Sequence, residues 1–242
     1  MDEKQLSIDI VGLLGACSDA LDCIEAELVN ISNKHGKRVA YMSVCMAKYW
    51  NVESDALQDL AICALLHDNA LTQYIAEEVQ KNHGIDVSDE TLNEKTNLHC
   101  IYGENNIAKI PFKTNVSNVI LYHHEHANGR GPFKKVWQET PLFARIIHLA
   151  DVVDAIASSW EFKQEKWDIC CEFLVKQKGQ LFDYECVEAF FKMISKETFH
   201  SFEDGTFESK LLAMVPRKKQ MVDWNTCKNI ADFFANIVDY KS

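Results

Sequence analysis

The sequence predicts an all-α fold, and three observations support this prediction. The 242 residues include only 9 glycines and 4 prolines, and this scarcity favours helices over many short strands and turns. Apolar residues recur at the spacing of amphipathic helices along most of the chain. Segments with the alternating apolar and polar pattern of a half-buried strand are nearly absent. We therefore expect a helical bundle around one large core.

The first half of the chain is expected to begin with helices over about 5–30 and about 34–50, each with an apolar face. A third helix should start near Glu53 and Asp55, because acidic residues stabilise a helix N-terminus, and end near His67 and Asp68. A short amphipathic helix is expected over 72–81. The polar segment 85–97 should be a loop.

In the second half of the chain, the spacing of apolar residues predicts helices over about 98–109, 114–124, 140–160, 165–178, 184–196 and 221–238. The segment 126–132 contains Asn-Gly, a further glycine and a proline, and it is the strongest loop signal in the chain. The segment 200–211 has the composition of a linker. We expect one large domain over residues 1–199 and a helical C-terminal appendage over 200–242.

Charge and cysteine content limit the class of protein. The net charge is −11, and an acidic surface argues against a nucleic-acid polymer as partner. No stretch is long and apolar enough for a membrane span, and the charged N-terminus lacks the apolar core of a secretory signal. The nine cysteines include no C-x-x-C pair, so we expect buried reduced thiols in a cytoplasmic protein rather than a cysteine-type zinc site.

Histidine and aspartate side chains recur at or near the expected helices, close to apolar faces. Each one taken singly is more often a packed or solvated residue than a ligand. As a set they offer mixed nitrogen and oxygen donors, which suit Fe, Mn, Zn or Co better than Ca or Mg. Two metals about 3.5–4 Å apart would use the whole set, as in phosphate-ester hydrolysis. The candidate ligands are His35, His67, Asp68, His99, His123, His124 and Asp151.

Six ordered blocks of sequence resemble the HD superfamily of metal-dependent phosphohydrolases. They are HGKRVA (35–40), ALLHD (64–68), HCIYGENNI (99–107), HHEHANGRG (123–131), ARIIHLADVVDAI (144–156) and GQLFDYECVEAF (179–190). Together they cover about two-thirds of the chain. The closest resemblance is to the HD-GYP branch, whose characterised members hydrolyse cyclic di-GMP. This resemblance implies an HD-domain helical bundle and a binuclear metal site built from the seven ligands above.

The resemblance also implies individual roles. His67 and Asp68 correspond to the defining pair and are the expected catalytic residues, with Asp68 as the carboxylate shared between metals. Asp154 is expected either to orient a ligand by bonding the side of it that faces away from the metals, or to be a helix-packing aspartate. Glu125 is expected to be structural rather than a ligand. Arg38 and Arg145 lie near ligands in sequence, and each could anchor a nearby carboxylate or be solvated. His126 is expected to be a solvated loop residue, with a contact to substrate as the alternative. His148 is expected at a packed or exposed helix position, with support of a metal ligand as the alternative.

The sequence departs from the family at the positions that hold substrate. The family lysine after His-Asp is Leu71, the Gly-Tyr-Pro segment reads Gly131-Pro132-Phe133, and only Lys163 remains of a basic segment. Lys163 and Asn128 are the candidate substrate-binding residues, although Asn128 is equally suited to set the Asn-Gly turn. The acidic residue that supplies a third metal in some members falls on Ile31, which predicts two metals at most.

We therefore expect a phosphodiesterase that acts on cyclic di-GMP or on another small nucleotide or phosphomonoester. The expected cofactors are two divalent transition metals, Fe or Mn first, with Zn, Co and Ni as alternatives. The alternative of a different class is a regulatory module that binds metal without turnover. It is favoured by the loss of the family residues that hold the substrate. A homodimer is a further expectation, based on an apolar face over 221–238.

Overall fold

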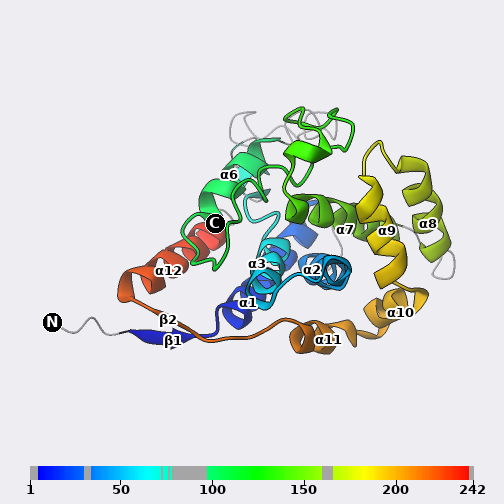
Figure 1. The fold of residues 1–242 in the computed structure, drawn as a ribbon. Helices are drawn as coiled ribbons and strands as arrows, with labels where there is room; N and C mark the ends of the chain where they lie inside the picture. Colours follow the sequence, from blue (N-terminus) through cyan, green and yellow to red (C-terminus); the bar gives the residue numbers. More distant parts are fainter. Residues whose placement is uncertain are drawn as a thin grey trace.

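The structure, a computed structural model, describes residues 5–29, 34–71, 73–75, 77, 97–159 and 166–239, without the side chains of 23–29, 159 and 236–239. Helices dominate this part of the chain (Figure 1). Its only sheet has two short antiparallel strands, β1 (Leu6–Ile8) and β2 (Gln220–Val222), with Leu6 opposite Val222. The expected all-α fold class is confirmed. None of the helices in the described ranges is long and apolar enough to cross a membrane.

The helices follow the chain order expected from the sequence over most of its length. Two short 3-10 turns, η1 (Lys48–Trp50) and η2 (Trp137–Glu139), accompany them. The α-helices are α1 (Ile10–Val29), α2 (His35–Ala47), α3 (Ser54–Leu65), α6 (Asn97–Ile107), α7 (Leu142–Ser159), α8 (Lys166–Gln177), α9 (Tyr184–Met193), α10 (Lys196–Asp204), α11 (Phe207–Met214) and α12 (Trp224–Asp239).

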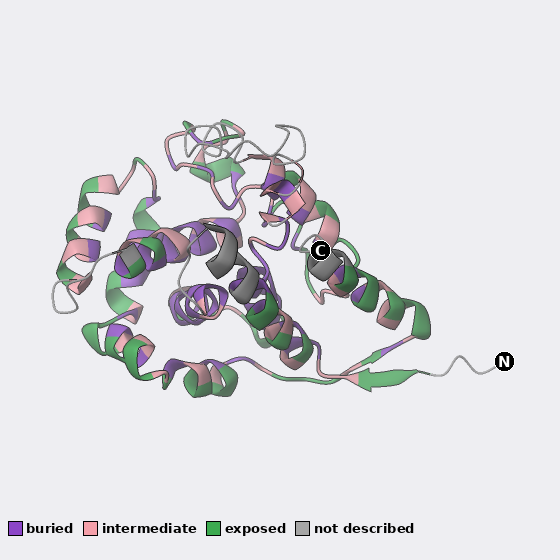
Figure 2. Cartoon of the chain, turned by 180° about the vertical axis from the view of Figure 1, so that it is seen from behind, coloured by how far each residue is buried: buried purple, intermediate pink, exposed green. Residues whose placement is uncertain are grey.

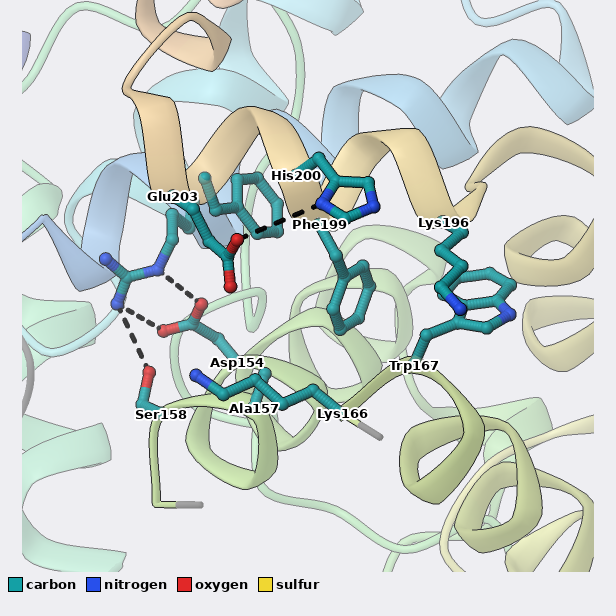
Figure 3. Close-up of a pocket in the computed structure, with 11 residues that line it drawn as sticks. Asp154, Ala157, Ser158, Lys166, Trp167, Lys196, Phe199, His200 and Glu203 are labelled. Atoms are coloured by element: carbon teal, nitrogen blue, oxygen red, sulfur yellow. Dashed lines mark hydrogen bonds and ion pairs between the residues drawn. The ribbon is translucent and has the colours of Figure 1, made fainter. Parts of the chain in front are cut away.

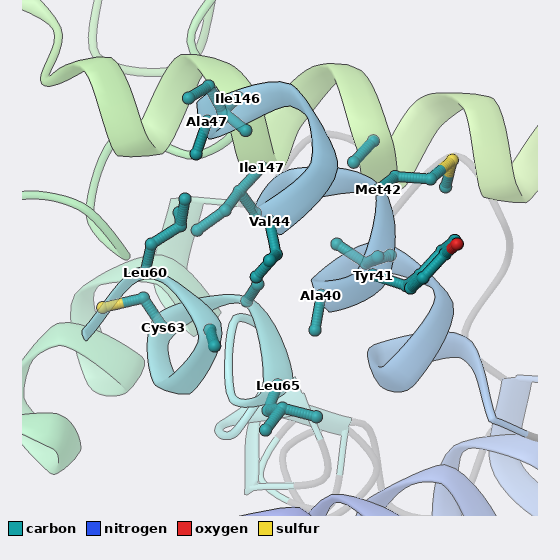
Figure 4. Close-up of a cluster of buried hydrophobic side chains, with 14 of the residues drawn as sticks. Ala40, Tyr41, Met42, Val44, Ala47, Leu60, Cys63, Leu65, Ile146 and Ile147 are labelled. Carbon is teal, nitrogen blue, oxygen red and sulfur yellow. The ribbon is translucent and has the colours of Figure 1, made fainter. Parts of the chain in front are cut away.

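Helix α2 is the centre of the core. Every residue of α2 except Lys37 is buried, and the helix contacts α1, α3, α7, α9 and α11. Figure 2 shows the buried residues concentrated in these central helices. Val44 of α2 packs in one cluster with Leu60 of α3 and Ile147 of α7 (Figure 4). Each such side chain contributes roughly 1.5–3 kcal/mol when fully buried. This core fixes the relative positions of the helices that carry the candidate ligands.

The helix expected over 114–124 is wrong. Residues 117–124 form consecutive turns, and Asn118 has a left-handed backbone with a φ of 66°. The carboxylate of Glu104 accepts hydrogen bonds from the backbone N–H groups of Asn118, Ile120 and Leu121 at 2.6, 3.1 and 3.0 Å. A side chain from another helix thus takes the donors that a helix would direct to its own carbonyls.

The linker expected over 200–211 is also wrong, because α10 and α11 occupy most of this segment. Gly205 ends α10 with a φ of 75°, the left-handed conformation that glycine adopts without strain. Asp204 then accepts hydrogen bonds from the backbone and hydroxyl of Thr206 just before α11. The polar residues in this segment therefore join two helices. The boundary expected after residue 199 falls inside α10, and the division into domain and appendage stays a prediction.

The remaining differences are smaller. The chain enters α1 only at Ile10, because residues 6–8 pair with β2. The loop expected over 126–132 is irregular, as predicted. The described residues of the segment expected as a helix over 72–81 are helical, and 85–96 lies outside the described residues.

Candidate metal centre

The seven expected ligands come from five parts of the fold and meet at one place. His35 is the first residue of α2, and His99 and Asp151 lie on α6 and α7. His67 and Asp68 lie in the turn directly after α3. The remaining two, His123 and His124, end the series of turns that Glu104 shapes. Helix α2 packs against both α3 and α7, and these contacts position His35, Asp151 and the turn with His67 and Asp68 relative to one another.

The ligand atoms form two clusters. The first cluster is His35, His67 and Asp151, whose ligand atoms lie within 4.8 Å of one another. In it, His35 Nε2 lies 3.3 Å from both His67 Nε2 and Asp151 Oδ1. The second cluster is His99, Cys100, His123 and His124, within the same limit.

Two carboxylates connect the clusters. Asp68 directs Oδ2 to His67 Nε2 of the first cluster, at 3.4 Å, and Oδ1 to His99 Nε2 and His123 Nε2 of the second, each at 3.4 Å. Asp151 contacts the first cluster through Oδ1, and its Oδ2 lies 3.9 Å from His124 Nδ1. Two carboxylates that each face both clusters are the arrangement expected of a two-metal site.

The hydrogen bonds behind the imidazoles determine which nitrogen carries a lone pair. The Nδ1 of His67 faces the carbonyl oxygen of Ala64 at 3.0 Å, and the Nδ1 of His123 faces that of Ile120 at 2.6 Å. A carbonyl oxygen only accepts, so Nδ1 carries the hydrogen and, in the neutral imidazole, Nε2 offers its lone pair to the site. The side chains are thus already in the tautomer that binds a metal.

Buried polar atoms in the site also fit a metal. Asp68 Oδ1 and His123 Nε2 are buried, and neither has a hydrogen-bond partner among the described residues. Leaving such groups unsatisfied costs roughly 1–3 kcal/mol each, and more for a charged group. A divalent cation between them would satisfy both, so the residues present fit the metals that the sequence analysis predicts.

The electrostatics of the site favour positive charge. Burial would raise the pKa of Asp68 and Asp151, but neighbouring imidazoles outweigh it and hold both pKa values well below the usual range. Burial would lower the pKa of His35, but Asp151 and Asp154 raise it well above the usual range. The ionised carboxylates therefore need compensating positive charge nearby. Protonated histidines or bound metal ions can provide it.

Asp154 supports the first cluster from behind. Its Oδ2 accepts a hydrogen bond from His35 Nδ1 at 2.8 Å, so that imidazole also presents Nε2 to the site. Arg38 donates from Nε to Asp154 Oδ1 at 2.6 Å and from a terminal nitrogen to Oδ2 at 2.8 Å (Figure 3). Arg38 thus anchors a carboxylate, one of the two roles left open by the sequence. The other side of this pair borders a pocket that includes Trp167 and Phe199 but none of the metal ligands.

Asn69 holds the turn that follows α3. Its side-chain amide donates to the carbonyl of Leu66 at 2.8 Å and to that of Gly103 at 3.3 Å. A Cβ on Gly103 would lie 3.1 Å from the Asn69 amide and closer still to another side chain. Glycine at this position therefore lets α6, which carries His99, approach the turn with His67 and Asp68.

Glu125 is buried and accepts hydrogen bonds from the backbone N–H groups of Phe133 and Lys135, a structural position as expected. Asn128 donates to Gln180, outside the loop, and accepts from the backbone of Arg130 within it, so both ends of its amide have partners in the protein. Its expected role toward substrate stays a prediction.

Three other expectations concern residues around the ligands. Arg145 donates to Asp183 at 3.1 Å and so also anchors a carboxylate. His126 is half-buried, whereas His148 is buried and stacks on it, and burial lowers the pKa of His148 to about 4. Lys163 and Ile31 lie outside the described residues.

Cys100 is the functional candidate that the sequence analysis missed. It is fully buried, as expected, but its Sγ lies 3.5 Å from His99 Nε2, inside the second cluster. Burial would raise the pKa of this thiol, but His123 and His99 lower it to about 6. The missing C-x-x-C pattern had argued against a cysteine ligand. Its position directly after a ligand histidine was the available signal.

Comparison with known proteins identifies similar chains. Over 92% of its length, this chain is 25% identical to the 3'3'-cGAMP-specific phosphodiesterase 1 of Vibrio cholerae, of which it covers 51%. Over 29% of its length it is 43% identical to the cyclic di-GMP phosphodiesterase response regulator RpfG of Xanthomonas campestris, of which it covers 19%. The chain thus spans about half the length of the first relative and less of the second.

A solved structure shares the fold. The crystal structure of a cyclic GMP-AMP specific phosphodiesterase of V. cholerae, V-cGAP3, superposes with a TM-score of 0.77 at 20% identity, over 99% of this chain and 61% of that one. The family model described as HD domain matches residues 22–186, which is more than half of the chain and contains every ligand of both clusters. The resemblance seen in the sequence motifs is confirmed, and the chain belongs to the HD-domain family.

Proposed function

We propose that this chain is a metal-dependent phosphodiesterase that hydrolyses a cyclic dinucleotide at a binuclear centre. The observation that carries the proposal is the pair of carboxylates, Asp68 and Asp151, each of which faces both ligand clusters. Cyclic di-GMP is the first substrate to test. The relative that matches over most of the chain is named for 3'3'-cGAMP, which is therefore the second.

Each ligand cluster would hold one metal. His35, His67 and Asp151 would hold one metal, and His99, His123 and His124 the other, with Asp68 between them. When bound, divalent metals supply positive charge for the phosphoryl oxygens and lower the pKa of water. Fe(II) and Mn(II) are the first metals to test, with Zn, Co and Ni as alternatives.

The surrounding residues position these ligands. The carbonyls of Ala64 and Ile120 and the carboxylate of Asp154 each hold one imidazole with Nε2 toward the site. The phosphate-binding lysine of the family is absent at Leu71, which removes a charge-assisted bond of roughly 1.5–3 kcal/mol. The phosphate of a bound substrate would therefore be held mainly by the metals. We expect weaker substrate binding than in family members that keep the lysine.

The test is hydrolysis by anaerobically purified protein reconstituted with Fe(II) or Mn(II). We expect cyclic di-GMP or 3'3'-cGAMP to be converted to the linear dinucleotide. Asp68→Ala should reduce turnover at least roughly 1,000-fold, because the metals supply several kcal/mol of transition-state stabilisation. Metal content and circular dichroism of the variant separate a lost site from a lost fold.

Failure of this test has a defined meaning. If the metal-loaded protein hydrolyses neither dinucleotide, the cyclic-dinucleotide assignment is wrong, and a panel of nucleotides and phosphomonoesters follows. If no compound of that panel is hydrolysed, the remaining hypothesis is a regulatory module that binds metal without turnover. The cytoplasmic location and the homodimer are retained as proposals, and the exposed Met221 and Trp224 are the residues to examine for the dimer.

A further inference from the structure

Cys100 occupies an unusual position for a buried thiol. It is fully buried on α6, and its Sγ, with one nitrogen from each of His99, His123 and His124, lies in a group whose members are all within 4.8 Å of one another. Neighbouring residues on a helix point about 100° apart, so only one of them usually faces a given site. Here both Cys100 and His99 reach the same side.

The distances within this group match those between donors bound to one metal. Zinc binds sulfur at about 2.3 Å and imidazole nitrogen at about 2.0–2.1 Å, and in a tetrahedral site these lengths place the two donor atoms about 3.5 Å apart. The Cys100 Sγ lies 3.5 Å from His99 Nε2. The same nitrogen lies 3.4 Å from Asp68 Oδ1, so this imidazole nitrogen has both a sulfur and a carboxylate oxygen as near neighbours.

A second observation points to the same place. His123 Nε2 is buried, presents its lone pair to the cluster and has no hydrogen-bond partner among the described residues. The charge balance also suits a thiolate, since two divalent cations bring more positive charge than the carboxylates of Asp68 and Asp151 offset. One thiolate would neutralise a further unit of charge inside the buried site.

We propose that the thiolate of Cys100 is a ligand of the metal held by the second cluster, together with His99 and His123. On binding, the thiol loses its proton to solvent and its sulfur forms the bond to the metal. This inference deepens the proposed function, because it rests on the metal centre and assigns its donor set. A sulfur donor makes the second cluster prefer zinc, cobalt or iron over manganese, whereas the nitrogen and oxygen donors of the first cluster do not.

The test uses the full-length chain, stripped of metal and titrated with Co(II) without oxygen. We expect a near-ultraviolet sulfur-to-cobalt charge-transfer band that Cys100→Ser abolishes. Cys186→Ala is the matched control, because Cys186 is equally buried but lies on α9, outside both clusters. The control should keep the band, and X-ray absorption of the zinc form should show a sulfur neighbour at about 2.3 Å.

Affinity gives an independent readout. Cys100→Ser should lower the zinc affinity of the second cluster more than roughly tenfold. Substitution of a residue that only hydrogen-bonds a ligand already lowers metal affinity roughly tenfold, and loss of a ligand should cost more. The affinity for manganese should change little. Cys100→Ala serves as a second variant if the serine form does not fold. Cobalt that binds with no charge-transfer band, and zinc with only nitrogen and oxygen neighbours, would overturn the cysteine ligand and leave the metal centre intact. A wild-type chain that binds no metal would overturn both.

Discussion

The two ligand clusters use similar side chains, and each contains one histidine bonded to a carbonyl three residues earlier, but their other supports differ. In the first cluster, His35 depends on the carboxylate of Asp154, 119 residues away in sequence, which Arg38 binds in turn. In the second cluster, His123 is oriented by a carbonyl three residues earlier, in a turn that Glu104 shapes. A charged partner raises the basicity of an imidazole more than a carbonyl does. The first cluster should therefore be sensitive to one remote substitution, and the second to the shape of a local turn.

Among the substitutions that distinguish the two clusters, Asp154→Asn should have the largest effect. The amide keeps the shape of the carboxylate but not its charge, so metal affinity at the first cluster should fall roughly 10–100-fold. The second cluster has no contact with Asp154 in the described structure, and its affinity should remain within about twofold. Calorimetric titration of the metal-free protein, resolved into two binding steps, measures both values.

Asp183→Asn provides the matched control for that substitution. Asp183 is also a buried aspartate that accepts a hydrogen bond from an arginine, in this case Arg145, and it caps α9 rather than supporting a ligand. We expect lower stability but unchanged metal affinity at both clusters. An equal loss of affinity at both clusters in Asp154→Asn would show that the two are not supported separately.

A smaller effect is expected from Glu104→Ala. Three backbone N–H groups before His123 would lose their acceptor, and stability should fall by about 1–3 kcal/mol in urea unfolding. Metal affinity should fall less than tenfold, and only at the second cluster, because the hydrogen bond of His123 to Ile120 remains. Glu104→Gln keeps one acceptor oxygen, so its stability should lie between those of Glu104→Ala and the wild type. A loss confined to the first cluster would contradict this assignment of the turn.

The smallest effect concerns a residue outside both clusters. Glu208 on α11 accepts hydrogen bonds from Lys34 at 2.6 Å and Lys37 at 3.1 Å, at the start of α2 beside His35. The bond from Lys34 is the largest cause of a lowered Glu208 pKa. Because these groups are partly exposed, Glu208→Gln should cost less than about 1 kcal/mol at neutral pH.

The pH dependence of that cost follows from the direction of the shift. A pKa that is lower in the folded state contributes stability above the unfolded value of about 4.3, and this is lost as the pH falls through the folded pKa. The difference between Glu208→Gln and the wild type should therefore shrink from about pH 7 to about pH 4 in urea unfolding. A constant difference at both pH values would show that packing, not charge, holds α11 on α2.

Several features of the site could be predicted from the sequence because they depend on residue type and local order. The seven candidate ligands follow from the order of His and Asp residues and from its resemblance to the HD family, whereas the irregular loop 126–132 and the ends of α3 and α7 follow from turn residues and helical periodicity. The failures at 114–124 and 200–211 have a common cause. In both, backbone N–H groups donate to a particular side chain, Glu104 or Asp204, and periodicity does not report such contacts.

By itself, the sequence of this protein determined an all-α chain with a set of candidate metal-binding side chains in a fixed order. Local chemistry also determined how His67 and His123 are oriented, since each bonds a carbonyl three residues earlier. Only the tertiary structure decided that Arg38 binds Asp154 and that Cys100 faces the ligand histidines. The first contact joins α2 to α7, and the second brings Cys100 of α6 to the turns that carry His123 and His124, so both depend on how segments far apart in sequence pack together.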